Sequence, residues 1–152
     1  MILKFLHIAL VFSGIALIYG TEVVLHRIGR TGDTRAIRTA FATARPVAMI
    51  APAVFWLGVA LGLAAGIFNG YDLLAPWLVA SYVLVGALFA VGMTVTMPWM
   101  NRVGTLSAAE PDGPATPQLS EILHSPMTTR LLYASVAVDV VIVALMVFKP
   151  GA

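Results

Sequence analysis

Cysteine is absent from this chain of 152 residues, and charged side chains make up only 11% of it. The lack of cysteine excludes disulfides, thiolate metal sites, cysteine nucleophiles and the covalent attachment of c-type haem. A soluble domain carries about 25% charged residues, whereas this chain is 60% hydrophobic with a mean hydropathy of +0.94. The apolar runs are continuous rather than alternating, so strands are not expected. We therefore predict an all-α integral membrane protein, in which each backbone amide is satisfied within a helix.

Motifs of common catalytic sites are also missing. The sequence contains no GxSxG, no HExxH, no phosphate-binding glycine loop and no DxD-type acid pair. The net charge of +2 is small and the arginines gather in one loop, which indicates membrane topology rather than nucleic-acid binding. The sequence favours a non-enzymatic protein that contacts the lipid bilayer and binds no nucleic acid.

Four apolar runs are long enough to cross a bilayer. We expect helices at about 5–25, 47–68, 77–98 and 131–148, and an irregular polar loop at 101–129. A secretory signal is the alternative for the first run, but that run is long for such a segment and no A-x-A-like cleavage site follows it. The whole chain, 1–152, is then predicted to be one integral membrane domain, a four-helix transmembrane bundle.

Arginine marks one side of this bundle. The first long loop holds Arg27, Arg30, Arg35, Arg38 and Arg45, and Arg102 and Arg130 flank the second, whereas Lys4 and Lys149 stand at the opposite ends of their helices. By the positive-inside rule, both longer loops are cytoplasmic, the 69–76 hairpin is extracytoplasmic, and the protein is N-out and C-out in the bacterial inner (plasma) membrane. The first loop could form a short amphipathic interfacial helix, since Ile37 and Phe41 recur at helical spacing, or a plain solvated loop.

Three glycines form a seam in the second span, from Pro46 to Phe68. Gly58, Gly62 and Gly66 share one helix face, where another backbone can approach closely. We expect this span to be the packing hub and Pro52 to kink it or to delay its regular part. The same seam could mediate a homo-oligomer.

Asp139 falls near the middle of the fourth span, where an acid costs about 2.5 to 3.5 kcal/mol on insertion scales. Depth matching places it level with Ser13 and Trp56, with no basic residue nearby. Three interpretations remain open: a hydrogen-bonded tether between helices, a proton or cation site, or a contact to a partner subunit.

His7 lies one turn inside the first span, at the depth of Ser81, Tyr82 and Met146. An imidazole facing a thioether could bind haem b or copper, with His7 and Met146 as the metal ligands. The alternative is a histidine hydrogen-bonded at the membrane interface.

Glu22 and His26 are four residues apart at the other end of the same span. We expect a local ion pair; a metal pair, reached by His124, is the alternative. Met93, Met97 and Met100 recur at roughly helical spacing, which is typical of packing and is also compatible with a copper relay.

Several residues carry a resemblance to a known family. The chain is similar to a bacterial family of four-helix predicted integral membrane proteins of unknown function, on the basis of Leu3-Lys4-Phe5-Leu6-His7, Gly14, Gly20, Arg30-Thr31-Gly32-Asp33, Pro52 and Gly62. More remotely, it resembles the copper-resistance D and J-type protoporphyrinogen oxidase membrane proteins. That resemblance implies a haem b ligand at His7, although the third span has no lysine or histidine to match a second one.

Three functions follow from these observations. The first is a non-enzymatic bundle, either an accessory subunit of a larger membrane complex or a small-solute or proton-handling protein that uses Asp139. The second is a membrane redox protein with haem b or copper on His7. The third is a structural homo-oligomer built on the glycine seam.

Overall fold

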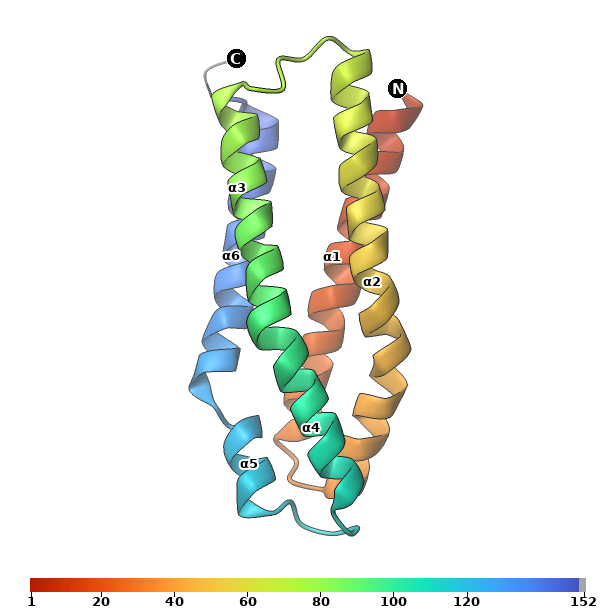
Figure 1. Cartoon of the computed structure of the whole chain (residues 1–152), viewed down its shortest axis with the longest axis vertical. Coiled ribbons are helices and arrows are strands. Elements are labelled where there is room, and N and C mark those ends of the chain that lie inside the picture. Colours follow the sequence, from red (N-terminus) through yellow and green to blue (C-terminus); the bar gives the residue numbers. More distant parts are fainter. Residues whose placement is uncertain (151–152) are drawn as a thin grey trace.

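Helices make up almost all of residues 1–150, the part of the chain that the computed structural model describes. In order they are α1 (Ile2–Gly29), α2 (Thr34–Phe68), α3 (Pro76–Val91), the π-helical turn η1 (Gly92–Thr96), α4 (Met97–Ala109), α5 (Pro117–Leu123) and α6 (Pro126–Phe148). Four helical stretches are long and apolar enough to cross a membrane: Ile2–Gly29, Thr34–Phe68, Pro76–Ala109 and Pro117–Phe148. The predicted all-α architecture with four membrane-capable helices is confirmed (Figure 1).

Each of the four long helical stretches begins before its predicted start, and the first and third also end later than predicted, whereas α2 and α6 end at Phe68 and Phe148 as predicted. The prediction followed the apolar runs, 5–25, 47–68, 77–98 and 131–148, but helical hydrogen bonding continues through polar residues once the chain leaves the hydrocarbon. The largest correction is at α2, which begins at Thr34 because the Asp33 carboxylate accepts a hydrogen bond from the Arg35 amide at 3.0 Å. The arginine-rich segment is therefore helical, and it is the first part of α2 rather than a separate interfacial helix.

The polar segment 101–129 is mostly helical, although an irregular loop with at most one or two helical turns at 118–124 was predicted. Its first part continues α4 to Ala109, and α5 follows after a short turn. Thr116 caps α5, since its hydroxyl accepts from the Leu119 amide at 3.4 Å. The four prolines of this segment stand in turns or in the first turn of a helix, where a missing N–H costs little.

The helices associate in two pairs (Figure 1). One pair is α1 with α2 and the other is α3 with α6, while α4 crosses to pack against α2. The start of α1, the end of α6 and the 69–75 hairpin lie at one end of the molecule, and α5 lies at the other with the arginine-rich segment. We name these the terminal end and the arginine end.

The arginine end contains the larger hydrophobic core. We call it the arginine-end core; it consists of Leu25, Ile37, Phe41, Trp99, Val103, Leu119 and Leu123. Polar contacts close it from outside. Arg38 donates from Nε to the Ser107 carbonyl (2.8 Å), from one terminal nitrogen to Asp112 (2.8 Å), and from the other to the Glu110 carbonyl. Since the last carbonyls of a helix have no internal partner, Arg38 caps the end of α4 as well as contributing positive charge.

A short backbone bridge joins the two loops at this end. The Thr34 amide donates to the Gly113 carbonyl at 3.0 Å, and the Ala115 amide donates to the Gly32 carbonyl at 2.7 Å. Gly32 and Gly113 have positive φ angles of 69° and 143°, which side chains other than glycine rarely adopt. The two loops therefore form one connected unit.

The terminal end is held by fewer contacts. Ala75, Trp77 and Leu78 form a small cluster with Leu73 and Met146. Beside it, the Lys4 ammonium donates to the Tyr71 hydroxyl at 3.0 Å, and the Lys149 ammonium lies 4.8 Å from the Tyr71 ring centroid. These cations lower the pKa of Tyr71 below its ordinary value, chiefly through the hydrogen bond from Lys4.

The seam between α1 and α2 is formed by glycines from both helices. A Cβ atom added at Gly58 would lie 2.8 Å from the Val11 amide nitrogen, and one added at Gly14 would lie 2.7 Å from Cβ of Phe55. Gly62 faces the His7 ring, whereas Gly66 faces Leu73 in the hairpin. Two of the three predicted seam glycines therefore accommodate α1 itself.

Candidate functional site

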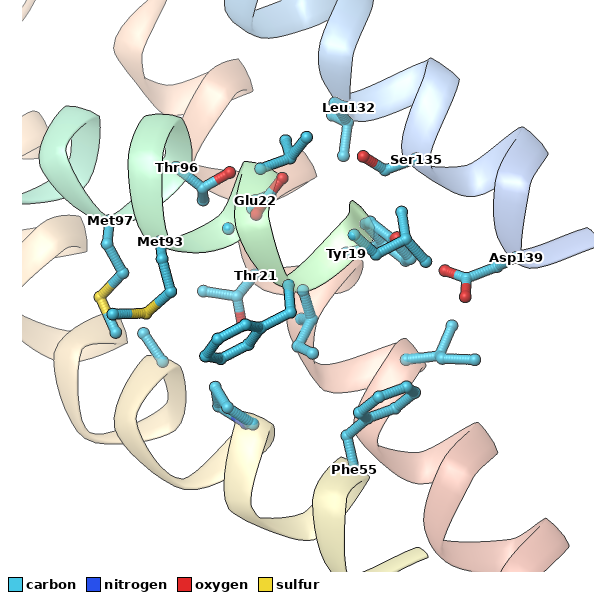
Figure 2. A pocket seen from close by; sticks show the side chains of 18 of the residues that line it. Tyr19, Thr21, Glu22, Phe55, Met93, Thr96, Met97, Leu132, Ser135 and Asp139 are labelled. Carbon is cyan, nitrogen blue, oxygen red and sulfur yellow. The ribbon is translucent and has the colours of Figure 1, made fainter. Parts of the chain in front are cut away.

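A cavity of about 190 Å³ lies in the middle of the bundle, where both helix pairs contribute to its wall. Most of its lining is aliphatic, aromatic or methionine, and no basic side chain belongs to it. Its polar side chains are Tyr19, Thr21, Glu22, Thr96, Ser135 and Asp139, several of which are labelled in Figure 2. Two carboxyl groups therefore open into one apolar space without a cationic residue in its wall.

Asp139 belongs to α6 and is only 8% exposed. Its carboxyl group faces the Tyr19 hydroxyl of α1, and Ser135 lies one turn away on α6 (Figure 2). Ser13, which depth matching placed at this level, is exposed on the outer surface of α1. Trp56, the other residue matched to this level, does line the same cavity as Asp139. Depth matching does not give the direction in which a side chain points, which is why Ser13 was misplaced.

Glu22 belongs to α1 and faces the Thr96 hydroxyl of η1 (Figure 2). The predicted ion pair with His26 does not form, and within residues 1–150 the one ion pair joins Arg38 and Asp112. The Glu22 carboxyl group instead lines the cavity inside the bundle.

His26 is buried at the arginine end of the same helix face. Its ring stacks on Trp99 of α4, with centroids 4.5 Å apart and planes 20° apart. Its Nδ1 atom is buried without a hydrogen-bond partner. A buried polar atom left unpaired in an otherwise well-packed core indicates a strained or functional position.

These groups form a column along α1. Tyr19, Glu22 and His26 are separated by three and four residues, which places them on one face of the helix. Asp139 meets this face near Tyr19, in the middle of the bundle, and His26 ends it beside the arginine-end core. We name this set the polar column; it connects the cavity with the arginine end.

Irregular backbone borders the cavity on two sides. Pro52 and Ala48 of α2 are in the lining, and because proline has no N–H, the Ala48 carbonyl lacks its usual helical donor. Opposite, η1 contributes Gly92, Met93 and Thr96. The π turn widens the helix just before Pro98, whose ring would otherwise clash with the carbonyl four residues earlier.

His7 lies outside this cavity. Its Nδ1 atom is 2.8 Å from the Gly58 carbonyl oxygen, so Nδ1 carries the proton and donates, and Nε2 remains a free acceptor. Met146, its predicted co-ligand, packs in the terminal-end cluster with Trp77.

The other residues predicted as metal ligands do not all meet at one site. Met93, Met97 and Met100 do share the cavity wall, with Met93 and Met97 side by side (Figure 2). His124 is exposed at the end of α5 and bonds back to Ser120. Among residues 1–150, no three His, Cys, Asp or Glu side chains are grouped closely enough to hold a metal ion.

Sequence reasoning missed Tyr19 and Thr96. Tyr19 is a hydroxyl-bearing residue deep in an apolar run and three residues before Glu22, which was a usable signal. Thr96 had no such signal, because its contact with Glu22 depends on the π turn. Chemically, the completed arrangement can exchange protons between carboxyl and hydroxyl groups or balance a cation.

Comparison with known proteins supports the membrane assignment. Residues 1–150 match the family described as "Predicted integral membrane protein (DUF2269)". No curated protein and no solved structure gives a significant match. With nearly the entire chain covered and four helices able to span a bilayer, this protein belongs to the DUF2269 family of multi-pass integral membrane proteins.

Proposed function

We propose that this protein handles protons within the membrane, with Asp139 and Glu22 as the exchanging groups. The supporting observation is that both carboxyl groups line one apolar cavity that has no basic side chain in its wall. An unpaired carboxylate costs several kcal/mol in such a setting, so each group either keeps its proton or exchanges it for another cation. Structural tethering alone would require a single carboxyl group.

The polar column supplies a route for the proton. Asp139 faces Tyr19, and Glu22 is three residues further along the same helix face, followed by His26. Histidine exchanges protons readily near neutral pH, and the free Nδ1 of His26 can take part in that exchange. Protons would enter this column at the arginine end, which the excess of arginine assigns to the cytoplasm, and would leave from Asp139 toward the terminal end.

Proton flux in liposomes tests this proposal. Purified protein would be reconstituted with a pH-sensitive dye inside, and a potassium diffusion potential would drive protons across. We expect a flux that falls at least about tenfold in Asp139→Asn and in Glu22→Gln, since the neutral amides hold no exchangeable acid proton. His26→Gln should slow the flux less, because it changes only the entry to the column.

Asp72→Asn is the matched control, since Asp72 is an exposed carboxylate in the hairpin outside the cavity. Its flux should equal that of the unmodified protein. Equal flux in the unmodified protein and all four variants, or no flux above that of empty liposomes, contradicts a proton-handling function and leaves the accessory-subunit function.

A haem b or copper protein using His7 is the second candidate. One contact favours it: Nδ1 donates to the Gly58 carbonyl, which leaves Nε2 free, as in most metal-binding histidines. A Soret band, or bound copper, that is lost in His7→Ala and kept in His124→Ala would support this function. A colourless, copper-free protein purified after haem and copper supplementation contradicts it.

Assembly and location are proposed on similar grounds. We infer that the protein resides in the bacterial inner membrane, N-out and C-out, because arginines gather at one end. We also infer that it assembles with a second copy or with a larger membrane complex. A groove between α1 and α2, lined by small residues that include Ala16, Gly20, Ala36 and Ala40, supports this assembly.

A further inference from the structure

We propose that the cavity binds a small organic monocation, a protonated amine carrying one ring, with Asp139 as its counterion. This inference rests on the proposed function, because it uses the same cavity and names what replaces the proton there. Binding converts the carboxyl group to a carboxylate beside the ammonium group, and the carboxyl proton leaves to water. One proton is thus released for each cation bound.

The charge of the cavity wall determines the sign of the ligand's charge. Asp139 is 8% exposed, its carboxyl group faces the cavity, and no basic residue belongs to the lining. An anionic ligand would place two like charges in a low-dielectric space without compensation. A cation is the only charged ligand that removes the electrostatic cost that Asp139 otherwise bears in ionised form.

The volume of the cavity limits the size of the ligand. Cavities that bury drug-sized ligands measure about 300 to 1,000 Å³, whereas an apolar cavity of about 150 Å³ holds benzene. At about 190 Å³, this cavity accepts one ring with a short ammonium arm. Larger lipophilic cations such as tetraphenylphosphonium should be excluded.

The lining supplies the remaining contacts. Phe55, Trp56 and Phe89 form a wall of rings in edge-to-face arrangement, with 5.9 Å between the first two centroids and 5.5 Å between the last two. Aromatic faces attract cations and also pack against a ligand ring. The Ala48 carbonyl, freed by Pro52, and the hydroxyl of Tyr19 are further acceptors for an ammonium group.

Titration calorimetry on the full-length protein in detergent micelles tests this inference with benzylammonium as the probe. Benzyl alcohol, a neutral molecule of the same shape, should bind at least about tenfold more weakly, because it lacks the charge that pairs with Asp139. Titrations in two buffers of different ionisation enthalpy should show release of one proton per ligand. Affinity should rise about tenfold per pH unit while the carboxyl group is protonated.

Variants locate the site. Asp139→Asn should weaken benzylammonium binding at least about tenfold and abolish proton release, whereas Asp72→Asn should change neither. Asp139→Glu, which keeps the charge, covers the case in which the amide variant does not fold, and it should retain proton release. Equal binding of the alcohol and the ammonium ion, or unchanged binding in Asp139→Asn, overturns the inference.

Different experimental results would refute the proton-handling function and the cation site. Proton flux without benzylammonium binding would refute the cation site and leave proton handling intact. Binding with proton release but without flux would refute proton handling across the membrane while the cation site stands.

Discussion

The two ends of this bundle are built differently. At the arginine end, seven buried hydrophobic side chains, a three-way contact from Arg38 and a backbone bridge between the loops join all four spans. At the terminal end, a three-residue buried cluster and the exposed group around Tyr71 hold the helix pairs. The comparison indicates that cohesion comes from the arginine end, while the terminal end depends on the helix pairs themselves and on the bilayer.

The cavity lies between the arginine end and the terminal end of the bundle. A cavity in the bundle lacks packing contacts, and this cost to stability must be offset elsewhere. The interlocked arginine end supplies that stability. The polar column then runs from the loosely packed middle of the bundle into its most tightly packed part.

Breaking the α1–α2 seam should have the largest effect, because it disrupts the pair that both ends depend on. Gly58→Val places Cβ 2.8 Å from the Val11 backbone nitrogen, which cannot move aside without shifting α1. We expect a loss of about 3 kcal/mol in thermal or denaturant unfolding in micelles. Gly86→Val is the control, since nothing lies within 4 Å of its added Cβ; an equal loss in the control would contradict the seam assignment.

Removing Arg38 should weaken the arginine end selectively. Arg38→Ala leaves the Ser107 and Glu110 carbonyls and the Asp112 carboxylate without their donor, and we expect a loss of about 2 kcal/mol. Faster amide hydrogen exchange should appear in residues 107–116 and not in 69–75. Arg35→Ala, whose side chain is exposed on the same helix, should stay within about 0.5 kcal/mol of the unmodified protein.

The smallest effect is expected at the terminal end. Since Lys4 and Lys149 lower the pKa of Tyr71, its phenolate should form at a lower pH than an ordinary tyrosine in an absorbance titration. Lys4→Gln should return the pKa of Tyr71 toward about 10. Unfolding stability near neutral pH should hardly change, because Tyr71 is exposed and its contacts with the lysines lie at the surface. An unaltered titration in Lys4→Gln would mean that this contact does not persist in solution.

Much of the fold could be predicted from the sequence, because four apolar runs and a one-sided arginine distribution are strong signals. The ends of the helices could not, since Pro46 suggested a helix start, whereas α2 begins earlier, at Thr34, and continues through Pro46. Of the site, Asp139 and Glu22 were identified as polar residues in costly positions. Their partners were not, because Tyr19 and Thr96 meet them only through helix pairing and the π turn.

The hairpin at Asn69–Ala75 has a consequence for how the chain could be divided. This hairpin is the covalent link between the α1–α2 pair and residues 76–150. The non-covalent contacts that hold these two parts together lie mainly at the arginine end, in the arginine-end core. Two polypeptides produced by cutting the gene at this point would each insert as a self-contained group of spans. Co-expressed, they should find one another in the membrane and copurify through the surfaces around Trp99 and Arg38.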